Sequence, residues 1–173
     1  MFLNNFRFLT FVLCFVACFG DLAKGHTKKT QNRALIKQMV IQEADKIGIS
    51  KSLALAVAHA ESNFNPLAES HKGARGVMQI MPATSQGEYL IHPDRLWDPR
   101  INIIIGLHYL RRLLIRYRGR PDLALSFYNG GSAVDRYGRG RPRVISYTRA
   151  YVMKVTRLRF KYERRLRSGK LRL

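Results

Sequence analysis

The chain has 173 residues, of which 46% are hydrophobic. This length is enough for one domain with a substantial core and too short for two domains that each have one. Lys and Arg number 31 against 11 Asp and Glu, which gives a formal net charge of +20. Such self-repulsion indicates a protein that works beside an anionic partner, and the candidates are cell wall, a lipid surface and nucleic acid.

The N-terminal residues have the pattern of a secretory signal peptide. Arg7 precedes an apolar run over residues 8–19, and polar residues follow. The run is too short to span a bilayer comfortably. We expect cleavage after Gly20, or as late as Gly25, so that residues 1–20 are removed and the protein is exported to the periplasm or cell envelope.

Both cysteines, Cys14 and Cys18, lie inside this segment, so the mature chain has no disulfide framework and no thiol metal site. The alternatives to cleavage are an uncleaved membrane anchor and a lipoprotein lipidated at Cys18. Phe15 argues against lipidation, because it stands where a lipobox usually has Leu.

Helical spacing of apolar residues begins directly after this segment. The pattern over residues 31–47 predicts an amphipathic helix, and Gly48 supplies a C-terminal stop. Ser50 can cap a second helix over residues 51–62. This second helix is apolar nearly all round, so we expect it to be buried.

The second half of the chain continues the helical pattern. Asp98 and Pro99 predict the cap and first residue of a third helix, and further helices are expected over residues 121–129 and from about 146 to 166. The third helix has one apolar stripe, formed by Ile103, Leu107, Leu110, Leu114 and Tyr117. Period-two alternation is not sustained anywhere, which predicts a mainly α fold with at most a small β element near residues 76–80.

Glu61 is a lone acid at the end of the apolar second helix. It follows Val57 by four residues and Leu53 by eight, so its carboxyl is expected to point toward apolar packing. Burial raises a carboxyl pKa, which keeps an acid protonated near neutral pH and able to donate. The alternative is a helix-end residue whose side chain bends out to water.

The residues after Glu61 favour a functional site. Asn63, Asn65 and Pro66 break the helix at once and place Glu61 at a helix–loop junction, where the wall of a cleft could lie. Gln79 is the polar residue in the apolar run that follows. It must either find hydrogen-bond partners in the backbone or serve a ligand.

Four blocks resemble the Slt-type (family 1) lytic transglycosylase domain of the lysozyme-like superfamily. Residues 61–85, ESNFNPLAESHKGARGVMQIMPATS, resemble its Glu-Ser pair, its Gly-Ala-x-Gly turn and its Leu-Met-Gln-Ile-Met-Pro-x-Thr run. Residues 98–114 and 122–134 resemble the next two blocks, and residues 147–155 resemble the closing Tyr block. The blocks occur in matching order across residues 36–155.

The resemblance implies a lysozyme-like fold and cleavage of the β-1,4 bond between N-acetylmuramic acid and N-acetylglucosamine in peptidoglycan. Glu61 would protonate the leaving oxygen and then act as base on the C6 hydroxyl of the muramyl sugar, leaving a 1,6-anhydro product. The partner would be the glycan strand, and no cofactor would be needed. By the same match, the substrate-binding residues would be Ser70, Met78, Gln79, Tyr128, Asn129 and Tyr151.

The resemblance assigns residues 31–155 to the catalytic domain and leaves residues 156–173 as a basic C-terminal helix or tail. For Tyr128 and Tyr151, core packing with a satisfied hydroxyl is the alternative to a role in the site. Members of similar size and with an export signal serve secretion or conjugation machines, which are partners by analogy alone.

The chain departs from the family pattern at three positions. Tyr147 stands where the closing block often has Glu, Phe127 replaces Ala before Tyr128, and Gly130 replaces Ala. The first change puts the details of the closing block in doubt, and none of the three removes the acid.

One rival interpretation is a hydrolytic lysozyme of the goose type, which would deliver water to the sugar. It would need a second carboxylate as base, roughly 6.5 to 9.5 Å from the first. The candidates are Glu69, Glu88, Asp94 and Asp98.

A second rival is a basic binding module without catalysis. Residues 154–173 hold nine Lys or Arg against Glu163 alone, and an apolar stripe runs through Val155, Leu158, Tyr162 and Leu166. Such a helix would lie on an anionic membrane surface or wall polymer, or dock on the domain. The export signal argues against nucleic acid. The five His residues show no metal-ligand spacing, so no metal is expected.

Overall fold

The computed structural model describes residues 32–136 and 141–171. The predicted signal peptide and both cysteines lie outside these residues. The chain divides into two units, residues 1–35 and 36–173. Of the first unit only residues 32–35 are described, and they are helical. The fold and the site belong to the second unit.

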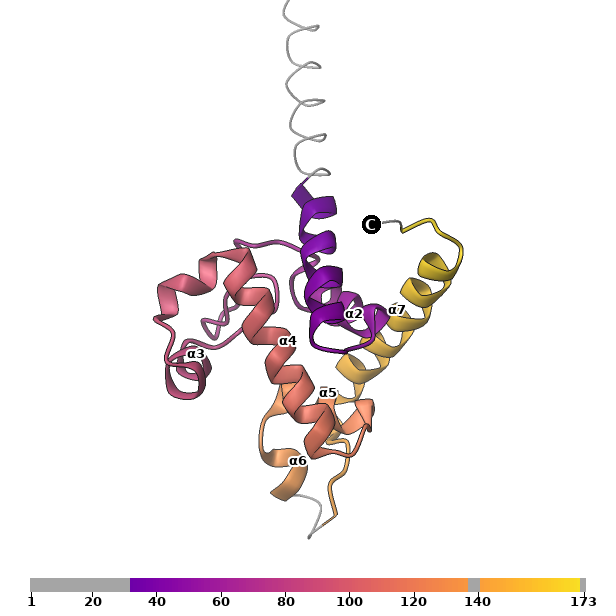
Figure 1. Ribbon diagram of the computed structural model, residues 1–173. Helices are drawn as coiled ribbons and strands as arrows, with labels where there is room; N and C mark the ends of the chain where they lie inside the picture. The colour runs from indigo at the N-terminus through magenta and orange to yellow at the C-terminus, as the bar shows by residue number, and fades with distance from the viewer. Residues whose placement is uncertain (1–31, 137–140, 172–173) are drawn as a thin grey trace, which may run out of the picture. The chain divides into compact units, whose positions relative to one another are not determined.

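The second unit is built from helices (Figure 1). Residues 36–46 are helical. The elements that follow are α2 (Lys51–Ser62), α3 (Pro82–Tyr89), η1 (Pro93–Trp97), α4 (Pro99–Arg116), α5 (Pro121–Gly130), α6 (Ala133–Arg136), η2 (Ser146–Thr148) and α7 (Arg149–Arg167), where η marks a short 3₁₀-helix. Across the described residues extended pairing is limited to two isolated bridges, Glu69 with Arg75 and Arg75 with Ile80. The predicted mainly α fold is confirmed.

The predicted helix starts are confirmed by their caps. The Ser50 hydroxyl accepts from the backbone N–H of Leu53 at 3.4 Å. The Asp98 carboxylate accepts from Arg100 N at 2.8 Å, and Pro99 occupies the first helical position. These side chains satisfy backbone donors that have no partner inside the helix.

Helix α3 was not expected from the sequence. It is short and polar, and Ser85 is its one buried residue. A helix with so little apolar surface has no periodic signal to detect. Its stability comes from its surroundings, including the bond from the Ser85 hydroxyl to the Ile91 carbonyl at 2.8 Å.

Helix α2 lies at the centre of the main core. Residues 52–58 are all buried, and α7 packs along α2 (Figure 1). The stripe of α4 faces the same core through residues that include Ile103, Leu107 and Leu110. A second, smaller cluster joins the end of α4 to α5 and includes Leu113 and Leu123. Helix α7 therefore holds α2 along its length, and α4 contributes to the same core from another part of the sequence.

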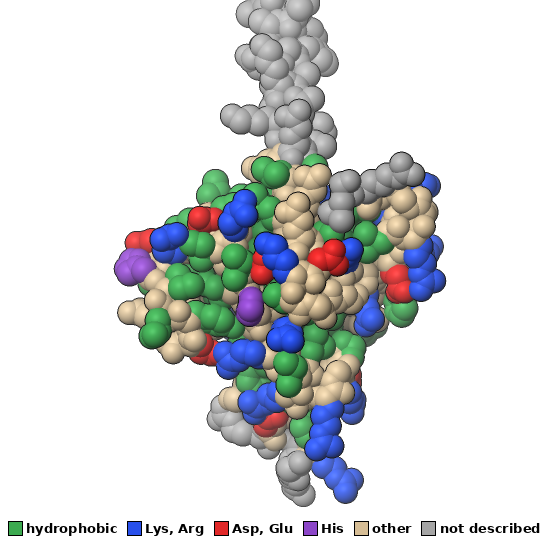
Figure 2. Space-filling model, viewed as in Figure 1, with side chains coloured by type: hydrophobic (Ala, Val, Ile, Leu, Met, Phe, Trp, Pro, Cys, Tyr) green, Lys and Arg blue, Asp and Glu red, His purple; other side chains and the backbone are tan. Residues whose placement is uncertain are grey.

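The apolar stripe of the basic C-terminal segment docks on the domain. Val155 and Tyr162 are buried in the main core, and Leu158 and Leu166 pack against it. Helix α7 runs without a break past residue 156. The exposed side of α7 is basic, and Lys and Arg gather along it in Figure 2. None of the helices in the described part of the chain is long and apolar enough to cross a membrane.

Candidate active site

Glu61 lies in the last turn of α2, where the chain reverses sharply. Asn63 caps the helix in the left-handed conformation with φ of 52°, and Phe64 follows with φ of 63°. The Phe64 side chain is buried, which fixes this turn against the core. Glu61 is thereby left partly buried at the junction between a rigid helix and a loop.

Helix α7 brings two side chains to Glu61. The Tyr151 hydroxyl donates to Glu61 Oε1 at 2.5 Å. Lys154, one turn further on, donates from Nζ to the Ala60 carbonyl at 2.7 Å. Burial raises the pKa of Glu61 to about 7, while the Tyr151 hydrogen bond and the Lys154 charge act in the opposite direction. A substantial fraction of Glu61 is therefore protonated near neutral pH.

The loop that carries Gln79 is held by one buried amide. Asn102, on α4, accepts from Met78 N at 2.7 Å, and its amide nitrogen donates to the carbonyls of Arg75 at 2.8 Å and Leu96 at 3.0 Å. A Cβ at Gly76 would lie 2.4 Å from the Asn102 amide nitrogen. The glycine is needed both for this contact and for its φ of 76°.

Two further contacts tie this loop to the helices around Glu61. The Ser62 hydroxyl donates to the Val77 carbonyl at 2.8 Å, which explains the serine of the Glu-Ser pair. The Tyr128 hydroxyl, on α5, donates to the Met78 carbonyl at 2.9 Å. Burial and the Glu61 charge raise the pKa of Tyr128, so its hydroxyl stays protonated near neutral pH.

Met78 differs from the expectation that its side chain lines the sugar site. It is fully buried, and its side chain packs over Gly106 of α4, where a Cβ would lie 2.4 Å from the Met78 Cβ. The glycine lets the loop approach the helix closely. The structure therefore gives Met78 a packing role, and the loop's polar contacts come from its backbone.

Gln79 is half-buried in the left-handed conformation, with φ of 50°. Its amide nitrogen donates to the carbonyls of Ala68 and Gly76, both at 3.0 Å. The sequence left two alternatives for Gln79, hydrogen bonds to the backbone or to a ligand. Backbone carbonyls are the partners of its amide nitrogen. Both bonds use the amide nitrogen, and the amide oxygen takes part in neither of them.

The two remaining predicted residues are Ser70 and Asn129. The Ser70 hydroxyl accepts from Ala74 N at 3.0 Å and so closes the turn before Gly76. Asn129 is exposed near the C-terminal end of α5, beside Tyr128 in sequence. The structure thus joins Glu61 to Tyr151 by a direct bond, and ties Tyr128 to the Gln79 loop.

Sequence reasoning missed Asn102 and Lys154. Asn102 carried a detectable signal, because it is a lone polar residue between isoleucines, as Gln79 is among apolar neighbours. Lys154 carried none, because it lies 94 residues from the carbonyl that it contacts.

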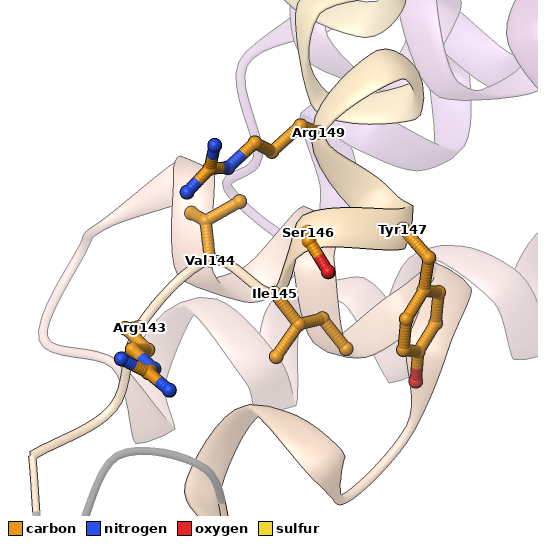
Figure 3. Close-up of a pocket in the computed structure, with 6 residues that line it drawn as sticks. All are labelled: Arg143, Val144, Ile145, Ser146, Tyr147 and Arg149. Carbon is orange, nitrogen blue, oxygen red and sulfur yellow. The ribbon is translucent and has the colours of Figure 1, made fainter.

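The residues that the structure describes contain no group of three or more His, Cys, Asp or Glu that could hold a metal ion. Glu61 is not among the residues that line the pocket drawn in Figure 3. That pocket has a volume of about 390 Å³ and is lined by residues 143–147 and Arg149. A protonatable carboxyl bonded to a tyrosine hydroxyl, on an α-helical scaffold, is the arrangement expected of a candidate general acid.

The chain belongs to the Transglycosylase SLT domain family, whose model matches residues 38–147. It is 35% identical over 128 residues to the membrane-bound lytic murein transglycosylase C of Cronobacter sakazakii, covering 65% of this chain and 35% of that protein. It is 37% identical over 90 residues to the soluble lytic murein transglycosylase of Salmonella typhimurium, covering 48% and 14%.

Two solved structures share the fold. An inactive Glu-to-Gln mutant of lytic transglycosylase Slt from Pseudomonas aeruginosa superimposes with a TM-score of 0.66 at 26% identity, covering 75% of this chain and 24% of that one. A complex of a 70-kDa soluble lytic transglycosylase with bulgecin A gives 0.65 at 29% identity, covering 75% and 24%. The chain therefore spans about a third or less of the length of these relatives.

Replacing Lys154 with Met is expected to raise the pKa of Glu61 further, because a positive charge that favours the carboxylate is removed. The carboxyl resonance of Glu61, followed by NMR against pH, should titrate at higher pH than in the wild type. Lys161→Met, two turns further along α7, is the matched control and should leave the titration unchanged. A Glu61 titration that does not move in Lys154→Met would contradict this electrostatic assignment.

Proposed function

We propose that this protein is a peptidoglycan lytic transglycosylase in which Glu61 is the single catalytic acid and base. The observation that carries the proposal is the partly buried Glu61 carboxyl, with its pKa raised to about 7, bonded to Tyr151 at the end of α2. Family membership supports the reaction class, and the inactive Glu-to-Gln mutant of the Pseudomonas aeruginosa homologue supports a glutamate in this role.

The reaction needs one group to serve in two steps. Protonated Glu61 gives its proton to the glycosidic oxygen as the bond from that oxygen to C1 of the muramyl sugar breaks. The Glu61 carboxylate then takes the proton of the C6 hydroxyl as that oxygen bonds to C1. The carboxyl ends protonated, no water is consumed, and a 1,6-anhydro sugar is formed.

The Tyr151 hydroxyl would stabilise the carboxylate between these steps, because hydrogen bonding to the charged form favours it. Burial disfavours the same charged form, so the two effects hold the Glu61 pKa between those of an ordinary acid and a fully buried one. An acid with a pKa near the working pH can both give and take a proton.

The other carboxylates support a one-acid mechanism over the goose-type alternative. Of the four candidates for a second acid, Glu69 and Asp94 pair with Arg75, and Glu88 pairs with Arg112 at 2.7 Å. Asp98 caps α4. Each already has a structural partner, so a free catalytic base is not evident among them.

For substrate binding, we propose that the amide oxygen of Gln79, the Ser70 hydroxyl and the Asn129 amide bond to sugar hydroxyl and acetamido groups. Tyr128 would act through the loop that it anchors at the Met78 carbonyl. We further propose that the protein is exported and acts in the cell envelope on glycan strands. The basic face of α7 would bind anionic wall polymer or a membrane surface there.

The mass of the soluble products tests this function. Purified wall sacculi digested with the wild-type protein should release muropeptides whose muramyl ends are lighter by one water than those from a hydrolytic lysozyme. Products with reducing ends would assign the goose-type hydrolysis instead. Binding to sacculi without any release of muropeptides would assign the non-catalytic basic module.

A further inference from the structure

Tyr147 presents an anchored aromatic ring to solvent just before α7. The residue is 63% exposed, yet its hydroxyl donates to the Gly130 carbonyl at 3.0 Å. Figure 3 shows the side chain extending away from Arg149. An exposed ring that is already held in one orientation loses little conformational entropy when it binds a ligand.

The ring packs beside a glycine. A Cβ at Gly130 would lie 2.7 Å from Thr148 Cγ2, 2.8 Å from Ile145 Cδ1 and 3.1 Å from Tyr147 Cε2. Gly130 and Tyr147 are two of the three positions at which the chain departs from the Slt-type pattern. The glycine leaves space for Thr148 and Ile145 first and for the tyrosine ring as well, so the two departures fit each other.

Tyr147 is connected to the candidate active site through Tyr151 and through the end of α5. Tyr151 follows it by four residues, across the junction between η2 and α7. Tyr151 donates to Glu61. On α5, the exposed Asn129 immediately precedes the Gly130 carbonyl that holds the Tyr147 hydroxyl.

We propose that Tyr147 is the stacking platform of a sugar subsite beside Glu61, which binds a pyranose ring of the glycan strand. The C–H groups of one pyranose face carry partial positive charge, and an aromatic face is electron-rich, so the two attract as they exclude water. The Asn129 amide can bond to substituents of the same sugar. The proposal rests on the proposed function, and it makes Tyr147 a determinant of glycan affinity.

The test measures glycan binding in Glu61→Gln protein, which should not turn the ligand over. The probe is a β-1,4-linked N-acetylglucosamine oligosaccharide without peptides, titrated by calorimetry. Adding Tyr147→Ala should weaken binding about tenfold, equivalent to about 1.4 kcal/mol. Adding Tyr147→Phe should retain most of the affinity, because the ring remains. Adding Gly130→Ala should weaken binding, because the new methyl group crowds the ring.

Phe160→Ala is the matched control, since Phe160 is a 61% exposed aromatic residue on α7. Its affinity for the oligosaccharide should equal that of the parent. Equal affinity in Tyr147→Ala and the parent would overturn the proposal, and so would a parent that does not bind the probe. If the wild type releases anhydro products while Tyr147→Ala binds normally, the subsite is wrong and the proposed function stands.

Discussion

Glu61→Gln protein is expected to lose peptidoglycan lysis by a factor of about 10² to 10⁴, the usual contribution of a general acid or base. The amide can neither give a proton to the leaving oxygen nor take one from the C6 hydroxyl. It is nearly isosteric, and its oxygen can still accept from Tyr151, so the site should keep its shape. Release of soluble muropeptides from sacculi measures the loss.

Glu69→Gln is the control for this experiment, because Glu69 is an acid of the neighbouring loop that pairs with Arg75. It should retain activity close to the wild-type value. Lysis at the wild-type rate by Glu61→Gln would show that Glu61 is not the catalytic acid and base. Loss of lysis in both variants would instead favour a mechanism with two carboxylates.

The same change should also stabilise the protein in a pH-dependent way. The pKa of Glu61 rises from 4.5 to about 7 on folding, so the folded state keeps a proton that the unfolded chain has lost. Wild-type stability should therefore fall as pH rises through this window, whereas Glu61→Gln has no such loss. The variant's advantage in free energy of unfolding should grow to at most about 3 kcal/mol. Urea denaturation at about pH 5 and about pH 8 measures it, and an equal difference at both would contradict the burial of the charged form.

Asn102→Leu is expected to have the second large effect, on stability as well as activity. The change keeps the number and branching of the side-chain heavy atoms but leaves the Met78 N–H and the carbonyls of Arg75 and Leu96 without their partner. Buried polar groups left unsatisfied cost about 1–3 kcal/mol each, so we expect a loss of about 3 kcal/mol or more in the free energy of unfolding. Activity should fall too, because this network positions the loop that holds Gln79.

Chemical denaturation of Asn102→Leu and wild type tests this role. Gln38→Leu serves as the control, since it makes a similar replacement of an amide at an exposed helical position. The control should change the free energy of unfolding by less than about 0.5 kcal/mol. An Asn102→Leu protein as stable as the control would show that the loop does not depend on this amide.

Helices with strong local signals were predictable, and polar connecting elements were not. Ser50, Asp98 and Pro99 marked helix starts because their side chains or rings act on the adjacent backbone. Helix α3 was not predicted, because its residues are mostly polar and show no apolar periodicity. From the sequence, the apolar stripe of the basic C-terminal segment could lie on lipid or dock on the domain. The burial of Val155 and Tyr162 shows that it docks on the domain.

The sequence by itself determined that a lone acid closes a buried helix, because helical spacing and an abrupt break are local properties of residues 51–66. Only the tertiary structure decided what surrounds that acid. Tyr151 reaches Glu61 across 90 positions of the chain, and Asn102 reaches Met78 across 24. Hydrogen bonds between residues so far apart in the sequence depend on how α4 and α7 pack. The burial that raises the Glu61 pKa arises from the same packing.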